Sequence, residues 1–409
     1  MRLPKLVTTL QSYNRGLFIA DLVAGVTVAM VALPLSLAIA IASGAEPERG
    51  LVTAIIGGFF ISALGGSRVQ IGGPTGAFIV VVAGVIGAHG YDGLVLATFM
   101  AGMILLVAGF FRAGRLARFV PDSVINGFTI GIAIIIATSQ LKDFFGLNLA
   151  SVPADFLPKV VALWAARDSF NASAVLISTL TLLLIVTLRW RFAKFPGLIV
   201  AVTVTSVLLV WAGLSVDTIH SRFGALPDHL PMPEIPMFDF SQVVELLPSA
   251  LVIAFLAGIE SLLSATVADR MSGGHHRPNA ELIAQGAANV ASSLFGGMPA
   301  TGAIARTATN VRAGAQTPVA GIIHAAVLLL VMLLAAPLAG FLAMPALATV
   351  LMVTAWNMSE PHKWQGYLAA PVTDRMLMLV TLVLTVVVDL SVAIIVGVAL
   401  GIAVRYFRK

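Results

Sequence analysis

The chain of 409 residues contains no cysteine and few charged residues. Without cysteine there can be no disulfide bonds, thiolate metal sites, dithiol redox motifs or cysteine nucleophiles. Only 11% of the residues are charged and 59% are hydrophobic, whereas a soluble domain carries about 25% charged and roughly 45–50% apolar residues. This balance excludes a soluble globular protein and indicates a chain that lies largely in a lipid bilayer.

The sequence also lacks the short motifs that mark common enzymes and cofactor sites. Neither a P-loop nor an HExxH or GxSxG motif occurs in a suitable context, and His275 and His276 have no partners at metal-ligand spacing. We therefore expect no enzyme, no cofactor and no metal. The net charge of +5 is typical of basic cytoplasmic loops rather than of nucleic-acid binding. The N-terminus resembles no cleaved signal peptide, so the first span is expected to direct insertion.

Long apolar stretches predict an all-α polytopic membrane protein with both termini in the cytoplasm. At about 20 residues per crossing, they fit about 14 transmembrane segments. The expected spans lie near residues 20–43, 51–65, 69–89, 92–111, 119–141, 172–188, 196–213, 243–268, 279–295, 297–313, 317–341, 344–356, 373–389 and 390–407. Basic residues such as Arg68, Arg189 and Arg270 follow even-numbered spans, and the loop 214–242 is acidic. Because Lys and Arg concentrate on the cytoplasmic side, this loop is expected to be extracellular.

An internal repeat relates the two halves of the chain. Residues 71–77 read IGGPTGA and residues 295–303 read FGGMPATGA. The same difference in residue number, 224, relates Gly72 to Gly296, Pro121 to Pro345 and Pro34 to Gly258. A common offset predicts two repeats of seven spans, and because seven is odd the second repeat is inverted. Inverted repeats of this kind are typical of secondary transporters.

The repeated segments fall inside the third and tenth spans and predict a binding site. Gly and Pro interrupt a helix, so each span should consist of an extended piece followed by a half-helix. The half-helices are expected to begin at Thr75, Gly76 and Ala77 and at Thr301, Gly302 and Ala303. Two helix N-termini facing one cavity would form an anion site from backbone N–H groups. In the alternative interpretation, the glycines only allow close helix packing.

Several polar residues within spans are further candidates. Ionisable residues at membrane depth are costly and usually functional. Glu260 is a candidate proton carrier, and Arg306 is a candidate partner for a substrate carboxylate; alternatively, the two form an ion pair that only braces their spans. Ser264, one turn after Glu260, is a possible cavity residue. Glu281, with Gln285 and Asn289 at helical spacing, predicts a polar seam to neighbouring helices.

Five stretches of the sequence resemble the SulP family of anion transporters, which includes the sulfate permeases and related animal anion exchangers. They are DLVAGVTVAMVALPLSLAIAIASG (21–44), GGSRVQIGGPTGAF (65–78), FVPDSVINGFTIGI (119–132), AGIESLLSATVAD (257–269) and GAIARTATNVRAGAQTPVAG (302–321). The stretches GIESLLSATVAD, AIARTATNVRAGA and AWNMSEPHK most resemble the bacterial C4-dicarboxylic-acid transporter branch (DauA-type).

This resemblance implies a domain organisation and a mechanism. It implies a homodimer in which a core domain (20–111 and 243–341) moves as an elevator against a gate domain (112–213 and 342–409). Residues 1–19 would form a cytoplasmic N-terminus and 214–242 an extracellular loop. The cytoplasmic STAS domain of the family is expected to be absent from this chain, which stops at Lys409: either the sequence is shortened or the protein lacks the domain. Sodium-coupled members bind the ion with a carboxylate and a threonine; here the matching positions hold Glu260 and Ile304, which favours protons.

The sequence thus predicts a proton-coupled symporter of C4-dicarboxylates such as fumarate or succinate, in a bacterial inner membrane. A sulfate or bicarbonate transporter of the same family is the nearest rival function. A nucleobase permease and an anion channel are two more candidate functions, from different classes of membrane protein. The expected partners are a small anion, the lipid bilayer and a second copy of the chain, without nucleic acid.

Overall fold

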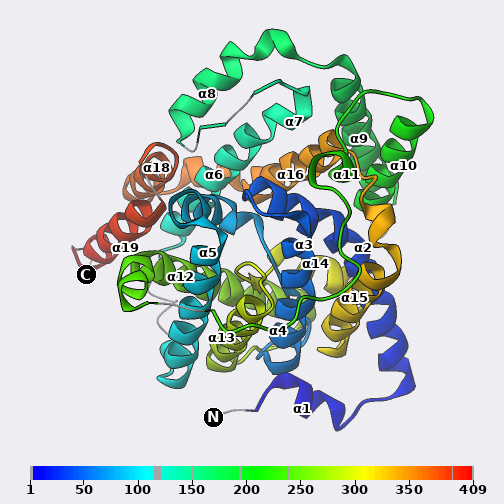
Figure 1. Cartoon of the computed structure of the whole chain (residues 1–409). Helices are drawn as coiled ribbons and strands as arrows, with labels where there is room; N and C mark the ends of the chain where they lie inside the picture. The colour runs from blue at the N-terminus through cyan, green and yellow to red at the C-terminus, as the bar shows by residue number, and fades with distance from the viewer. Residues whose placement is uncertain are drawn as a thin grey trace.

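The computed structural model describes residues 3–114, 121–149, 152–153, 155–192, 196–236, 239–388 and 390–407. Within them the chain forms helices and one two-stranded sheet (Figure 1). The described chain is mostly helical, as the sequence predicts, and the small sheet departs from the expected all-α fold.

The first half of the described chain consists of α1 (Lys5–Leu10), α2 (Arg15–Ala42), α3 (Pro47–Val52), the π-helical turn η1 (Thr53–Gly57), α4 (Gly58–Leu64), β1 (Gly72–Gly73), the 3-10 turn η2 (Gly76–Phe78), α5 (Ile79–Phe110), α6 (Asp122–Ser139), α7 (Leu141–Phe145), α8 (Phe156–Ala165), η4 (Arg167–Ser169), α9 (Ala172–Arg191) and α10 (Gly197–Trp211). The second half consists of α11 (Ile219–Phe223), α12 (Phe240–Ser272), α13 (Pro278–Leu294), β2 (Thr301–Gly302), α14 (Ile304–Arg312), α15 (Val319–Ala339), α16 (Met344–Met358), η5 (Pro361–Lys363), α17 (Trp364–Ala369), α18 (Val372–Val387) and α19 (Leu390–Phe407).

Seven described helical segments are long and apolar enough to cross a membrane. They are Arg15–Ala42, Pro47–Leu64, Gly76–Phe110, Asp122–Phe145, Ala172–Arg191, Phe240–Ser272 and Val319–Ala339. The shorter helices α8 and α10 are also apolar. Helix length and composition therefore support a multi-pass protein, while the expected count of about 14 crossings stays a prediction.

Local sequence explains where several helices begin, bend and end. The side chain of Asn14 accepts a hydrogen bond from Leu17 N–H at the start of α2, and Asn171 caps α9 in the same way. Gly273 ends α12 in the left-handed conformation (φ 70°). The helical part of the third expected span and the fourth expected span are continuous in α5, which is interrupted at Gly90, where φ is 70°.

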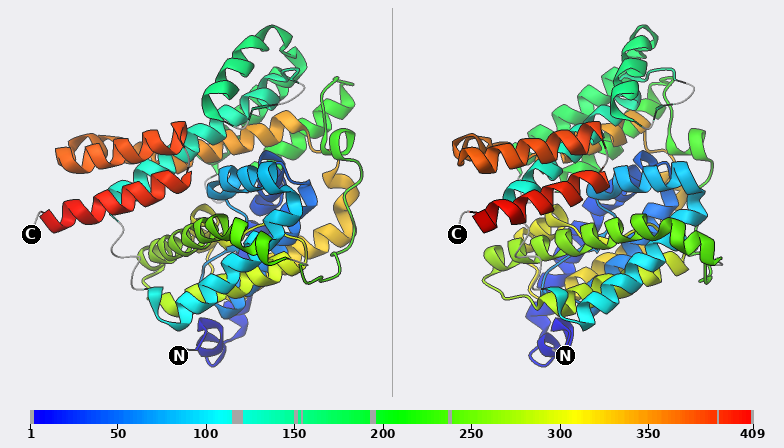
Figure 2. Two further views of the ribbon diagram at one scale, coloured as in Figure 1. Left: turned by 60° about the vertical axis from the view of Figure 1, so that its left-hand side comes forward. Right: turned by 90° about the vertical axis from the view of Figure 1, so that its left-hand side faces the viewer.

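The helices pack in two groups. In the first group, α5 packs against α12 and α13, α15 packs against α2 and α4, and α14 lies between α2 and α12. In the second group, α6 packs against α16 and α18, and α9 packs against α10 and α16. Helices α10 and α16 also contact α2, which joins the groups (Figure 2). Both groups combine helices from both halves of the chain.

The two strands lie buried within the first group. β1 and β2 pair antiparallel, with Gly72 opposite Gly302 and Gly73 opposite Thr301. Non-helical backbone within a membrane protein must find hydrogen-bond partners in the protein, and this pairing supplies them. The sequence predicts two extended pieces, but not that they pair.

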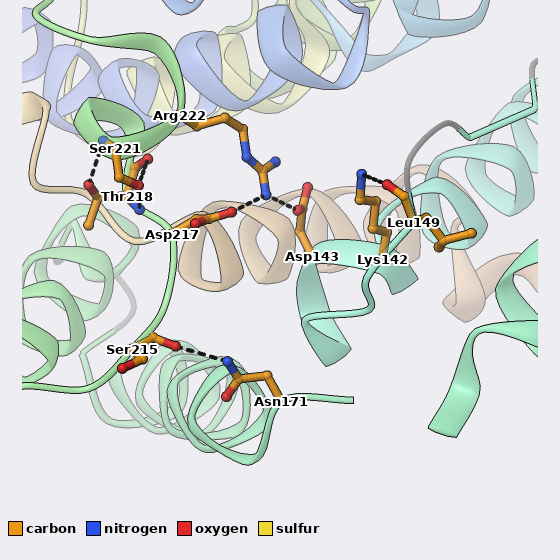
Figure 3. Close-up of polar contacts among 9 residues, drawn as sticks. All are labelled: Lys142, Asp143, Leu149, Asn171, Ser215, Asp217, Thr218, Ser221 and Arg222. Carbon is orange, nitrogen blue, oxygen red and sulfur yellow. Dashed lines mark hydrogen bonds and ion pairs between the residues drawn. The ribbon is translucent and has the colours of Figure 1, made fainter. Parts of the chain in front are cut away.

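Arg222 of α11 binds Asp143 of α7 (2.8 Å) and Asp217 (2.9 Å), as Figure 3 shows. We call these three residues the linker clasp. They line a cavity of about 770 Å³. Helix α11 also bonds the connection between α15 and α16, because His220 N–H donates to Gly340 O. The clasp therefore fixes two interhelical connections to the second group.

Candidate anion-binding site

The paired strands place two helix starts next to each other. After the extended Thr75, the 3-10 turn begins at Gly76 and leads into α5. After Ala303, α14 begins at Ile304. Ala303 N–H donates to Ile71 O (2.8 Å), which ties the start of α14 to the residue before β1. The first N–H groups of a helix have no acceptor within that helix, so both starts can offer donors to an anion.

Threonines from both copies of the repeat contact the same helix, α12. Thr75 donates its hydroxyl hydrogen to Oε2 of Glu260 (2.8 Å). Thr301 donates to the carbonyl oxygen of Ala257 (2.8 Å). Residues three apart in a helix lie on one face, so one face of α12 holds both threonines. The carboxylate of Glu260 is half-buried at this face.

Arg306 lies behind β1 rather than in the open. Its side chain is 1% exposed, and Nη2 donates to Pro74 O (2.9 Å) and to Ser36 Oγ (3.3 Å). Among the described residues, Nε and Nη1 have no hydrogen-bond partner. None of the described salt bridges within 4.0 Å joins Arg306 to Glu260. The guanidinium therefore contributes a buried positive charge beneath the strand pair.

The glycines in and next to the β1–β2 strand pair have close neighbours on different sides. A Cβ atom at Gly73 (φ 147°) would lie 2.5 Å from Arg306 Nη1, and one at Gly302 would overlap the side chain of Gln70. A Cβ atom at Gly76 would lie 3.1 Å from Sδ of Met358 on α16. Gly76 thus faces the second helix group, while Gly73 and Gly302 are packed within the first.

The remaining predicted site residues, Ile304, Ser264 and Ala77, differ in how far they are exposed. Ile304 is 37% exposed at the start of α14. Ser264 is fully buried and donates to Oγ1 of Thr307 (3.1 Å), which also accepts from Ile71 N–H (3.0 Å). Ala77 is buried beside the first helix start. The structure thus brings Thr75, Gly76 and Glu260 together, and it places Ser264 in the packing behind them.

Sequence reasoning missed two residues whose hydrogen bonds hold the β1–β2 strand pair in place. Gln70 donates through Nε2 to Ser261 Oγ (2.9 Å), and Thr307 links α14 to β1 as described above. Their polarity alone was too common a signal to single them out. The predicted polar seam of α13 does reach the β1–β2 strand pair. Asn289 accepts from the N–H of Ala300, just before β2, and donates to the carbonyl oxygen of the same residue. Among the described residues, no group of three His, Asp or Glu side chains could hold a metal ion.

The sulfate permease family matches residues 18–381 of the chain. This chain belongs to the sulfate permease family. YvdB of Bacillus subtilis, which carries the name of a sulfate transporter, is 44% identical over 380 residues, covering 93% of this chain and 72% of YvdB. The bicarbonate transporter BicA of Synechocystis is 34% identical over 382 residues, covering 90% of this chain and 66% of BicA. The family consists of membrane transporters and not of enzymes, so this chain is a membrane-embedded anion transporter.

Two solved structures agree with the fold. The transmembrane domain of a cyanobacterial bicarbonate transporter, BicA, superposes with a TM-score of 0.83 at 30% identity, covering 95% of this chain and 98% of that domain. SLC26A9 superposes with a TM-score of 0.89 at 18% identity, covering 99% of this chain and 68% of SLC26A9. The second likeness concerns the fold alone.

Proposed function

We propose that this family member is a secondary active transporter of a small inorganic oxyanion of the sulfate or bicarbonate type. The observation that carries the proposal is the pair of helix starts, at Gly76 and Ile304, held together by the β1–β2 pairing above the buried charge of Arg306. Backbone N–H groups at helix starts bind compact anions without a charged side chain in the cavity. The names of YvdB and BicA support this class of substrate.

A C4-dicarboxylate such as fumarate or succinate is the second candidate, because three stretches resemble that branch of the family. A dicarboxylate needs a positive partner for each end. Arg306 is the second partner that the sequence predicts, but its Nη2 atom is bonded to Pro74 O and Ser36 Oγ and its side chain is 1% exposed. This enclosure favours the smaller anion.

Coupling to protons through Glu260 is part of the proposal. The carboxylate is half-buried, accepts a hydrogen bond from Thr75 and has no salt-bridge partner among the described residues. A sodium ion requires several oxygen ligands, and the apolar Ile304 stands where the resemblance implies a threonine ligand. A proton requires only one acceptor, which Glu260 provides.

The proposed motion is an elevator in a homodimer of the bacterial inner membrane, with both termini in the cytoplasm. The first helix group (20–111 and 243–341) is the core domain, and the second (112–213 and 342–409) is the gate domain. Gly76 supports this assignment, because it sits at the contact between the groups, close to Met358 and Ile136. Substrate bound at the start of α5 would be uncovered when the groups slide past each other.

Uptake of radiolabelled anions into proteoliposomes tests the function. Sulfate, bicarbonate, fumarate and uracil are compared under an imposed proton gradient, a sodium gradient or neither. We expect sulfate or bicarbonate to accumulate with the proton gradient alone. Accumulation of fumarate only would support the dicarboxylate assignment, and uptake of uracil only would support a nucleobase permease. Anion flux that never exceeds equilibrium would indicate a channel.

A further inference from the structure

Glu281, near the N-terminus of α13, is a buried carboxylate with a full set of hydrogen-bond donors. Its side chain is 0% exposed. Oε2 accepts from the backbone N–H groups of Gly66 (2.8 Å) and Ser67 (3.1 Å). Oε1 accepts from Ser261 Oγ (3.2 Å) and from Gln285 Nε2 (3.2 Å). These donors come from three separate parts of the fold: the connection before β1, α12 and α13.

The carboxyl group of Glu281 is held without a salt bridge. None of the described salt bridges includes Glu281. Four donors and the positive end of the α13 dipole stabilise it instead. A buried carboxyl group with four hydrogen bonds fixes the positions of its donors, because losing any one bond leaves a buried polar group unpaired.

The bonds of Glu281 lead directly to the candidate site. Ser261, which donates to Glu281, is the residue after Glu260 on α12. Ser261 also accepts from Gln70 Nε2 through its hydroxyl oxygen (2.9 Å) and its carbonyl oxygen (3.3 Å). Gln70 packs against Gly302 of β2, where a Cβ atom would overlap its side chain. One chain of contacts therefore joins Glu281 to the helix of Glu260 and to the strand pair.

We infer that Glu281 is a positioning residue for anion binding: through Ser261 and Gln70, it sets α12 and the β1–β2 pair in the relation that lets Thr75 contact Glu260. This inference rests on the proposed function. Glu281 does not touch the anion. It acts because a shift of α12 relative to the connection 65–71 would separate Glu260 from Thr75 and move both helix starts.

Asp21 offers a matched control within the same chain. Its carboxylate is also 0% exposed, and it accepts from two backbone N–H groups, of Gln316 (2.8 Å) and Thr317 (3.0 Å), and from the hydroxyl of Thr317 (2.5 Å). Among the described residues, the side-chain hydrogen bonds of Asp21 come from Tyr13 and from the connection between α14 and α15, and none comes from α12. A purely structural role predicts similar consequences for Glu281→Gln and Asp21→Asn.

The test measures sulfate and bicarbonate dissociation constants, from anion-dependent thermal stabilisation of the full chain in detergent, and uptake kinetics in proteoliposomes. The variants are Glu281→Gln, Ser261→Ala, their combination, and Asp21→Asn. Ser261→Ala removes the bonds that the Ser261 hydroxyl makes to Glu281 and Gln70 and leaves the Gly66 and Ser67 bonds in place. It therefore tests the inference even if Glu281→Gln does not fold.

We expect Glu281→Gln and Ser261→Ala each to raise Kd and KM by about 3- to 10-fold, the effect of losing about one hydrogen bond. The double variant should be no weaker than the more affected single variant, because both changes cut the same link. Asp21→Asn should lower the melting temperature and the maximal rate per milligram while Kd and KM stay unchanged.

Unchanged Kd and KM in Ser261→Ala, or equal changes in Asp21→Asn, would overturn the inference while leaving the proposed function intact. A wild-type protein that binds and transports neither sulfate nor bicarbonate would overturn the proposed function, and the inference with it.

Discussion

At the scale of single residues, the crossing of β1 and β2 is surrounded by buried polar atoms that lack partners. Arg306 retains two such nitrogens and Gln70 retains Oε1. Arg306 packs against Gly73, and Gln70 packs against Gly302. A buried polar atom without a partner costs about 1–3 kcal/mol. Their position against the two strands supports the proposal that this part of the fold binds a ligand, because a structure built only for stability would pair these atoms.

Replacing Glu260 by Gln tests coupling at this scale. The amide oxygen of Gln can still accept the Thr75 hydroxyl, so folding and anion binding should persist. The amide cannot take up a proton near neutral pH, so Glu260→Gln should exchange internal for external anion but no longer accumulate anion against a gradient. Counterflow and gradient-driven uptake on one preparation measure both. Wild-type accumulation in Glu260→Gln would exclude Glu260 as the proton carrier.

Gly73→Ala tests the strand pair. At φ 147° an alanine is strained, and its Cβ would meet Arg306 Nη1. We expect a loss of about 1–3 kcal/mol in the free energy of unfolding, together with loss of uptake. Gly84→Ala is the control, because a Cβ atom there meets nothing within 4 Å, and it should be neutral or slightly stabilising. Melting temperatures in detergent compare the two; a neutral Gly73→Ala would contradict the proposed packing.

At the scale of elements, helix α16 extends from the candidate site to the linker clasp. Helix α16 spans 15 residues, which is about 22 Å of helix. Met358 at its C-terminal end lies near Gly76, whereas Met344 at its N-terminal end lines the cavity beside the linker clasp. One helix therefore connects the candidate site to the clasp at its far end.

Asp143→Asn tests the linker clasp. Asp143 is 16% exposed and bonds Arg222 at 2.8 Å, so losing its charge should cost about 1–2 kcal/mol of stability. Asp168→Asn is the control, because the Arg167–Asp168 pair is far more exposed and should contribute under about 1 kcal/mol. Because the clasp is distant from Gly76, Asp143→Asn should leave the KM for the anion unchanged. An altered KM would place the clasp in the binding site.

At the scale of the whole molecule, the two helix groups each combine segments from both halves of the chain. This arrangement follows from the packing of α5 against α12 and α13 and of α6 against α16 and α18. The contacts of α10 and α16 with α2 join the groups, so a sliding motion of one group against the other has to break and remake them. The orientation of both groups in the membrane depends on which loops face the cytoplasm.

The absence of cysteine makes that orientation directly testable. Cysteine introduced at the exposed His229, in the loop 214–242, should react with a membrane-impermeant maleimide in intact cells. Cysteine at the exposed His275, between α12 and α13, should react only after permeabilisation. The cysteine-free parent supplies the background. The opposite pattern would reverse the proposed orientation and place both termini outside.

Composition and local pattern determined the class of this protein and much of its architecture. Few charges and long apolar runs require a bilayer, because such a chain cannot cover itself with polar surface. Gly and Pro occur together in the repeated segments, and together they disfavour a helix, so the helix breaks within 71–77 and 295–303 were predictable. The candidate residues Glu260 and Arg306 followed from ionisable side chains at membrane depth, and Thr75 followed from the repeated segment.

Only the tertiary structure decided how these pieces meet. Gly72 pairs with Gly302, 230 positions away in the sequence, and no local signal specifies a partner or a register at that distance. Arg306 is buried against β1, where it bonds Pro74 O and Ser36 Oγ, because the rotation of α14 about its axis depends on its contacts with α2 and α12. Ser264 is enclosed for the same reason. Side-chain direction is a property of packing, which the order of residues alone leaves open.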